Sequence, residues 1–200
     1  HVEHKGKLVF SLASGENNSK PQIDCSSIRG VCHRVEADEA AKKHLAYGKR
    51  VGLNTIRFWM SPKLFASSGE AYVKKVVDFV RVCHSCGYKV MPILFNGNML
   101  NPDTIMPESY EAADKYAAAF INALKDEPGL LMFDMMNEPL CNPWISNAKD
   151  QEKKNRSQQI WNFLRRQILM AKKLAPKCLF TVGYTTAYEI TKNTEENPEY

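Results

Sequence analysis

A carboxylate directly follows a long apolar run at Asn137-Glu138-Pro139, where the segment "LLMFDMM" (130–136) ends. A carboxylic acid in the poorly hydrated mouth of an apolar strand keeps its proton more readily than one in water, so it can act as a general acid near neutral pH. The same three residue types are also common in a helix-capping turn. The apolar strand before them favours the catalytic interpretation of Glu138.

A second charged residue in an apolar setting is Arg57, in "LNTIRFW" (53–59). A guanidinium among Ile56, Phe58 and Trp59 is costly to bury unless it faces an anion, and it lowers the pKa of a carboxylate beside it. Two interpretations follow from this position. Arg57 either tunes a catalytic carboxylate or forms a structural salt bridge.

Further polar and aromatic side chains end the apolar runs or follow them, and they could bind a hydroxylated ligand such as a sugar. Aromatic rings stack on sugars but also fill protein cores, and an isolated histidine is often only a structural group. No cluster of His and Asp has convincing metal-ligand spacing, so we expect neither a metal nor a cofactor. The candidate ligand-binding residues are His33, Trp59, Asn96, Trp144 and Tyr184, with Trp144 the preferred stacking platform.

The elements that must position these residues alternate along the chain. Short apolar runs predict buried strands, and a 3.6-residue apolar period between them predicts helices. The predicted strands cover 27–33, 53–59, 88–95, 130–136 and 178–184, and the predicted helices cover 37–49, 70–86, 108–125 and 150–174. Gly52, Gly87 and Gly129 each stand between a helix and the next strand, where we expect a left-handed cap, and Pro176 stops the last helix.

Repeated strand-then-helix units predict a parallel sheet with right-handed crossovers, which either closes into a barrel or stays open and doubly wound. The segment after the first strand has neither G-x-G-x-x-G nor a Walker lysine, which an open nucleotide-binding sheet would show. The sequence therefore favours a (β/α)8 TIM barrel. In such a barrel the active site lies at the carboxyl ends of the strands, where the polar residues above are found.

The composition indicates one globular domain over residues 1–200, with 44% apolar residues and a net charge of +5 spread along the chain. No basic run interleaved with aromatics predicts a nucleic-acid partner, and no run of roughly 20 apolar residues predicts a membrane span. Six cysteines are too few to build a disulfide scaffold, although one or two bridges are compatible with the sequence. We interpret "CHSC" (83–86) as helix packing rather than as a redox or zinc motif.

The motifs "GLNTIRFW", "GYKVMPILFNGN", "LLMFDMMNEP" and "LFTVGY", in this order, resemble glycoside hydrolase clan A, especially family 5 and the related family 2 barrels. The resemblance runs from about Ile28 to Tyr184. It implies a retaining β-glycoside hydrolase, cellulase-like or mannanase-like, acting on a β-linked glycan by double displacement in a secreted or periplasmic setting. Glu138 would be the general acid/base, Asn137 would bind the sugar 2-hydroxyl, and Arg57 would keep the nucleophile ionised.

The same resemblance places the nucleophile on a seventh strand, whereas the chain ends at "ITKNTEENPEY", just past the fifth predicted strand. A complete barrel takes roughly 250 residues, so we expect only about five β/α units here and no activity from this chain alone. Glu189 has no supporting motif and is interpreted as a surface residue. The open edge would be covered by self-association or by a missing C-terminal half. The alternative is a non-catalytic carbohydrate-binding remnant or pseudoenzyme.

Overall fold

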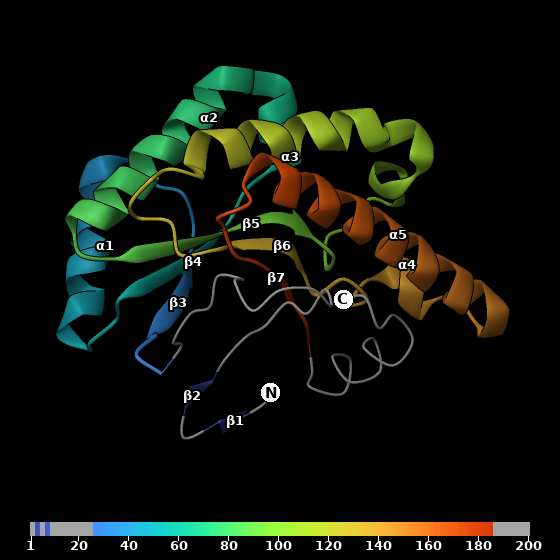
Figure 1. Cartoon of the computed structure of the whole chain (residues 1–200), viewed down its shortest axis with the longest axis horizontal. Coiled ribbons are helices and arrows are strands. Elements are labelled where there is room, and N and C mark those ends of the chain that lie inside the picture. Colours follow the sequence, from blue (N-terminus) through green and yellow to red (C-terminus); the bar gives the residue numbers. More distant parts are fainter. Residues whose placement is uncertain (1–2, 5–6, 9–25, 186–200) are drawn as a thin grey trace.

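The computed structural model describes residues 3–4, 7–8 and 26–185 (Figure 1). Glu189, considered above, and Cys25, one of the six cysteines, lie outside the described residues. Near the N-terminus, β1 (Glu3–His4) and β2 (Lys7–Leu8) form a short antiparallel pair. All other described elements belong to one α/β unit between residues 30 and 183.

The centre of this unit is a sheet of five parallel strands that are hydrogen-bonded in sequence order. Each crossover therefore moves the chain one strand further in the same direction, as in a barrel, whereas a doubly wound sheet reverses direction at a switch point. This order confirms the predicted partial barrel architecture, with five strands and the helices between them among the described residues. The strands are β3 (Gly30–His33), β4 (Thr55–Trp59), β5 (Lys89–Asn96), β6 (Phe133–Asn137) and β7 (Phe180–Gly183).

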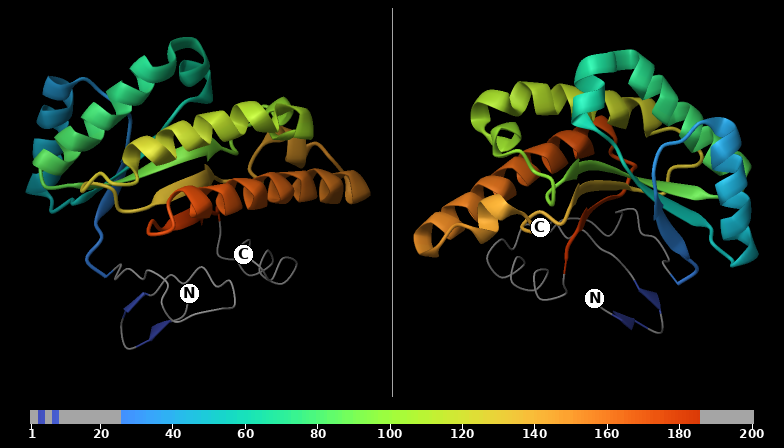
Figure 2. Two further views of the ribbon diagram at one scale, coloured as in Figure 1. Left: turned by 45° about the horizontal axis from the view of Figure 1, so that its top comes forward. Right: turned by 180° about the vertical axis from the view of Figure 1, so that it is seen from behind.

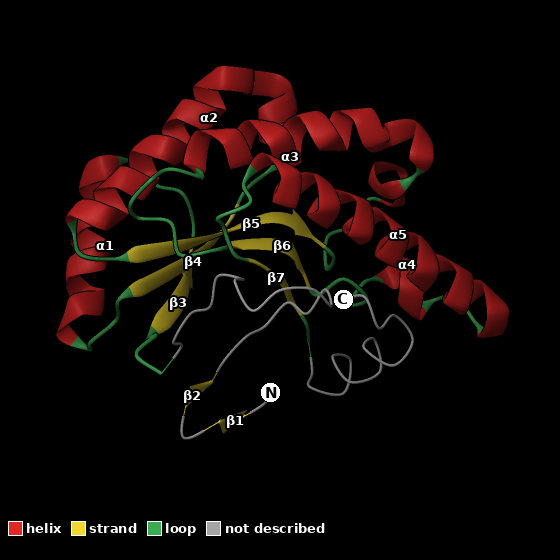
Figure 3. Ribbon diagram, in the orientation of Figure 1, coloured by secondary structure: helices red, strands yellow, loops and turns green. Residues whose placement is uncertain are grey.

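Helices connect successive strands and pack on one face of the curved sheet (Figures 1, 2 and 3). The long helices agree with the predicted ones to within a few residues, apart from the start of the second. They are α1 (Asp38–Arg50), α2 (Pro62–Ser85), α3 (Tyr110–Leu124) and α5 (Asp150–Leu174), with the short α4 (Pro143–Ser146) and the 3₁₀ turns η1 (Pro102–Ile105) and η2 (Pro107–Ser109).

The core lies between the sheet and the helices, and aromatic side chains fill much of it. Phe58 on β4 meets Phe79 on α2 edge to face, with ring centroids 5.2 Å apart, and Phe95 meets Phe163 in the same way at 5.0 Å. All four rings are buried. Such pairs contribute about 0.5–1.5 kcal/mol each beyond their area burial, which helps to hold the helical layer against the strands.

The start of α2 at Pro62 corrects the prediction that this helix begins at residue 70. Ser61 caps the helix by accepting a hydrogen bond from the Leu64 N–H at 3.2 Å, and Pro62 occupies the first helical position, where its missing N–H has no cost. Gly69, with φ 49° and ψ −125°, then interrupts the helix. The predicted start near residue 70 is therefore the start of its second, longer part.

Two of the three predicted glycine caps are confirmed. Gly52 and Gly87 have φ of 78° and 77°, a left-handed conformation that glycine adopts at little cost. Gly129 is not left-handed, so that prediction is wrong, and α3 already ends at Leu124. A Cβ at Gly129 would lie 2.9 Å from the His84 Cβ, so glycine is required there by close packing against α2.

Candidate active site

An ion pair joins Arg57 on β4 to Asp134 on β6. It lies on the face of the sheet that the helices do not cover, which we call the inner face. The Nε and Nη2 of Arg57 donate to Asp134 Oδ2 at 3.0 and 2.6 Å, and the Gly183 N–H donates to Asp134 Oδ1 at 3.2 Å. The Asp134 side chain is 0% exposed and that of Arg57 is 22% exposed. Arg57 therefore faces an anion of this same chain. The sequence-based prediction did not include Asp134, although an aspartate within an apolar run was a usable signal.

Burial and charge act against each other in this pair. Desolvation raises the pKa of Asp134 above its ordinary value, although the Arg57 guanidinium and the backbone N–H groups of Gly183 and Met136 oppose that rise. Burial by itself would lower the pKa of Arg57, but the charge and hydrogen bonds of Asp134 raise it overall. Arg57 is thus a fixed cation at the carboxyl end of β4.

Asn137 extends this network to β5. The Arg57 Nη2 donates to Asn137 Oδ1 at 2.7 Å, and the Asn137 Nδ2 donates to Asn96 Oδ1 at 3.1 Å. The pairing of β6 with β7 shifts register between Asp134 and Asn137, so two side chains an odd number of residues apart both reach Arg57. The structure therefore brings three predicted site residues, Arg57, Asn96 and Asn137, into one hydrogen-bonded chain.

Glu138 follows directly and is partly exposed. Its Oε2 accepts a hydrogen bond from the Asn98 Nδ2 at 3.3 Å. Its φ is 47°, a left-handed conformation that costs a non-glycine residue about 1–3 kcal/mol. Hydrogen bonds to Gly183 O (2.6 Å) and from Cys141 N (3.1 Å) hold this backbone. Strain of this kind is typical of functional sites, where a fold fixes one side chain in a required direction.

Two glycines let the backbones approach closely around this site, and sequence reasoning missed both. Gly97 donates its N–H to Asn137 O at 2.7 Å, and a Cβ at Gly97 would lie 2.2 Å from Glu138 O. A Cβ at Gly183 would lie 2.6 Å from the Arg57 Nη2. Any other residue at either position would displace the groups that orient Glu138 and Arg57.

Trp59 lies beside the ion pair. It has the same strand parity as Arg57, so both side chains project from the inner face of β4. The Arg57 Cζ is 5.8 Å from the Trp59 ring centroid, within the range of a cation–π contact, and Trp59 is 39% exposed. This indole is therefore available for stacking next to the polar network.

His33, predicted to line the same site, lies on the other face of β3. Cys32 pairs in register with Arg57 and its Sγ accepts from the Arg57 Nη1 at 3.8 Å, so Cys32 is on the inner face. Its neighbour His33 points to the helical side, where its ring centroid is 6.2 Å from that of Phe79 on α2. The structure does not bring His33 together with the polar network.

The other two predicted aromatic ligands also contact the helical layer. The Tyr184 ring centroid lies 6.0 Å from that of Trp161 on α5. Trp144 on α4 is partly buried, with the Arg156 Cζ 5.2 Å from its ring centroid. Their roles in ligand binding stay predictions, and among the three candidate aromatics Trp59 has the most direct contact with the network.

A groove of about 1290 Å³ also runs between α2 and α3, lined by Phe65, Val73, Tyr116 and neighbouring residues of the two helices. None of Arg57, Asn137 and Glu138 lines it. The groove lies on the helical side of the sheet, so we do not assign it to the catalytic chemistry.

The fold and the site define a barrel-type α/β protein in which strands β4 and β6 of one parallel sheet bring together a guanidinium, an amide and, directly after β6, a carboxylate. The profile of Cellulase (glycosyl hydrolase family 5) matches residues 16–184. The chain belongs to this family, which confirms the resemblance seen in the sequence. No curated protein sequence matches the chain.

Solved structures confirm the architecture. The endo-β-1,4-mannanase from Thermotoga petrophila is 14% identical with a TM-score of 0.60, and 78% of this chain covers 42% of that chain. The endo-1,4-β-mannanase from Rhizomucor miehei is 15% identical with a TM-score of 0.61, and the match covers 78% of this chain and 56% of that chain. The exo-β-1,4-mannosidase Op5Man5 from Opitutaceae bacterium strain TAV5 is 20% identical with a TM-score of 0.62, and the match covers 78% of this chain and 31% of that chain.

The chain thus spans about half of the length of these structures or less. At such identities the likeness establishes the fold, not the substrate. Across the described residues, the helices are too short or too polar to cross a membrane.

Proposed function

We propose that the chain carries the acid/base half of a retaining glycoside hydrolase site acting on a β-1,4-linked glycan, such as a mannan or a glucan. The observation that supports this is the position of Glu138, held in a strained conformation at the end of β6 beside the Arg57–Asp134–Asn137 network. In the first step Glu138 gives its proton to the glycosidic oxygen while a nucleophile attacks the anomeric carbon and the C–O bond breaks. In the second step water attacks the glycosyl intermediate and returns a proton to Glu138.

Asp134 is not the nucleophile in this proposal. Its side chain is 0% exposed, and its Oδ2 already accepts two hydrogen bonds from Arg57. A nucleophile must reach the sugar about 5–5.5 Å from the acid/base carboxyl group, and a completely buried carboxylate has no such access. The nucleophile of this proposal is therefore a carboxylate other than Asp134.

Asn137 is placed to recognise the sugar. Its Oδ1 is occupied by Arg57 and one Nδ2 hydrogen by Asn96, so the amide orientation is fixed by its partners. An amide nitrogen has two hydrogens, and the second is available for a substrate hydroxyl. Trp59, exposed beside Arg57, provides a surface on which a pyranose ring can stack.

The test is the Glu138→Gln variant in a form of the protein that hydrolyses β-1,4-mannan or cellulose oligosaccharides. We expect turnover of these substrates to fall by about 10²- to 10⁴-fold, because the leaving oxygen loses its proton donor. Activated aryl glycosides should lose much less in the bond-breaking step, since their leaving groups need no proton. The exposed Glu108→Gln on η2 is a matched control and should leave turnover unchanged.

Equal activity of Glu138→Gln on unactivated substrates would reject the assignment. Binding of the oligosaccharides without release of reducing ends, by any form of the protein, would instead favour a carbohydrate-binding remnant. The exposed Trp59 is the feature that supports this second candidate, and Trp59→Ala would then weaken binding.

A further inference from the structure

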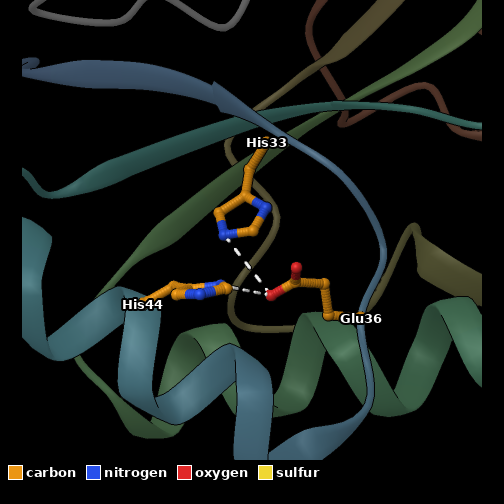
Figure 4. Close-up of side chains that lie close together, drawn as sticks. All are labelled: His33, Glu36 and His44. Carbon is orange, nitrogen blue, oxygen red and sulfur yellow. Dashed lines mark hydrogen bonds and ion pairs between the residues drawn. The ribbon is translucent and has the colours of Figure 1, made fainter.

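A cluster of His33, Glu36 and His44 lies on the helical side of β3, away from the inner face of the sheet. His33 ends β3, Glu36 is in the loop that follows, and His44 is in the second turn of α1 (Figure 4). The Glu36 Oε2 lies 2.7 Å from the His44 Nδ1 and 3.7 Å from the His33 Nε2. These three potential ligand atoms all lie within 4.8 Å of one another.

We propose that this cluster is a metal site for a borderline divalent ion, with Zn²⁺ as the reference ion. Two imidazole nitrogens and one carboxylate oxygen are ligands that Zn²⁺ prefers, at about 2.0–2.2 Å each. In a tetrahedral site such ligands are roughly 3.3 Å apart, between the two separations seen here. Small rotations of the three side chains would bring these atoms, which already lie within 4.8 Å of one another, around one ion, with the fourth position left for water.

The exposure of the three side chains also suits an ion that enters from solvent. The Glu36 side chain is 7% exposed, so its charge is held in place, while the His33 and His44 side chains are 16% and 45% exposed. The Arg34 Nε donates to the other carboxylate oxygen, Glu36 Oε1, at 3.0 Å. That contact orients the carboxylate as an outer partner would and leaves Oε2 for the metal.

Binding requires a defined movement of protons. The Arg34 N–H donates to His33 Nδ1 at 2.7 Å, so the neutral ring carries its proton on Nε2. To ligate through Nε2, His33 moves this proton to Nδ1 and the contact with Arg34 opens. His44 likewise ligates through Nδ1 with its proton on Nε2.

The site would connect β3, the loop after it and α1. β3 has a hydrogen-bonded neighbour on one side only, β4, so it is an edge strand of the described sheet. An ion bound only by the folded chain stabilises it by mass action, and here that stabilisation acts on the first β/α unit. These residues do not stand out as a metal site in the sequence, because His-x₂-Glu-x₇-His spans a strand, a loop and a helix and matches no common ligand spacing.

The experiment uses the full chain with His1→Ala and His4→Ala, which removes two other histidines that could bind metal. After treatment with a chelator and its removal, Zn²⁺ is titrated by calorimetry and Co²⁺ by visible absorption. We expect one ion per chain. Glu36→Gln and His44→Ala should each lower the affinity for the ion by at least roughly 10- to 100-fold. That is the loss seen when a residue that only hydrogen-bonds a metal ligand is removed. Glu39→Gln and His84→Ala are the matched controls and should bind as the parent does.

Folding of each variant is checked by circular dichroism in the presence of chelator. If Glu36→Gln fails to fold, His44→Ala decides the question, because the His44 side chain is 45% exposed. Unchanged affinity in His44→Ala would overturn the proposal. A sulfur-to-cobalt charge-transfer band would also overturn it, since it would assign the ion to cysteine ligands instead.

Discussion

Arg57 on β4 donates two hydrogen bonds to Asp134 on β6, across the intervening strand β5. The pair ties together strands that share no backbone hydrogen bonds, and its guanidinium also binds Asn137, the residue before Glu138. The orientation of Glu138, the proposed acid, therefore depends on the ion pair that Arg57 forms with Asp134, four residues before Glu138. A single buried contact thus links the stability of the sheet to the geometry of the site.

Replacing Asp134 with asparagine should destabilise the fold. The substitution keeps the side-chain shape but leaves the Arg57 charge without its partner, which costs about 3–5 kcal/mol when both groups are completely buried. Arg57 is 22% exposed, so we expect a smaller loss of about 2–3 kcal/mol in the free energy of unfolding, measured by urea denaturation.

The control for that measurement is Asp78→Asn, which breaks the exposed pair between Lys74 Nζ and Asp78 Oδ2 at 2.5 Å. Exposed pairs contribute little, so the change should stay within about 0.5 kcal/mol. Equal effects of the two substitutions would contradict a structural role for the buried pair.

A second prediction concerns Gly97. A Cβ there would lie 2.2 Å from Glu138 O and 2.6 Å from Pro139 Cα, and both are backbone atoms that cannot rotate away. Gly97→Ala should therefore lower the free energy of unfolding by more than about 2 kcal/mol and shift the Glu138 backbone. Urea denaturation measures the first effect.

Gly30→Ala is the matched control for Gly97→Ala. Its Cβ would meet Thr55 O at an ordinary 3.6 Å, and its φ is not positive, so the variant should be neutral or slightly stabilising. A tolerated Gly97→Ala would show that the two backbones are not as close as described.

Periodicity was sufficient to predict most of the fold, because buried parallel strands and amphipathic helices have different repeats in the sequence. All five parallel strands and four long helices lie within the predicted ranges or a few residues beyond them, except at the start of α2. The start of α2 was missed because the apolar helical period is clear only after Gly69, whereas the helix is initiated earlier by Ser61-Pro62. Gly129 was misassigned because a glycine is required at this position by close packing rather than by a left-handed turn.

The candidate site was only partly predictable. Residues at strand ends could be named, and the register of parallel strands places Asn96 beside Asn137. The direction of a side chain at a strand end depends on strand parity and local irregularities, which is why His33 lies on the helical side and Asn137 on the inner face. Asp134 was missed because its neighbours made the run read as uniformly apolar.

The cysteines should differ strongly in reactivity. Cys83 is 0% exposed, and its burial, together with a smaller effect of the neighbouring Cys86, raises the pKa of its thiol to about 12. Near pH 8 only roughly one Cys83 in ten thousand is then a thiolate, the reactive form. Cys32 and Cys141 are exposed and unpaired. Mass spectrometry after brief iodoacetamide treatment should find these two labelled and Cys83 unlabelled until urea is added. Rapid labelling of Cys83 in the native chain would contradict its burial.

Glu36 should make the stability of the metal-free chain depend on pH. Burial by itself would raise the pKa of Glu36, but hydrogen bonds from His44 and Arg34 and the charges of His33 and His44 lower it below the ordinary 4.5. A carboxyl group with a lowered pKa in the folded state stabilises the fold above its unfolded-state pKa. That contribution is lost as pH falls from about 4.5 through the lower, folded-state pKa.

Urea denaturation with chelator present, at several values between about pH 6 and about pH 3, measures this effect. Glu36→Gln does not titrate, so the stability difference between the parent chain and this variant should shrink as pH falls below about 4.5. Glu39→Gln, whose wild-type side chain is 90% exposed, is the control and should show no comparable change. If the difference between parent and Glu36→Gln were independent of pH across this range, His44, Arg34 and His33 would not be stabilising the charged form of Glu36.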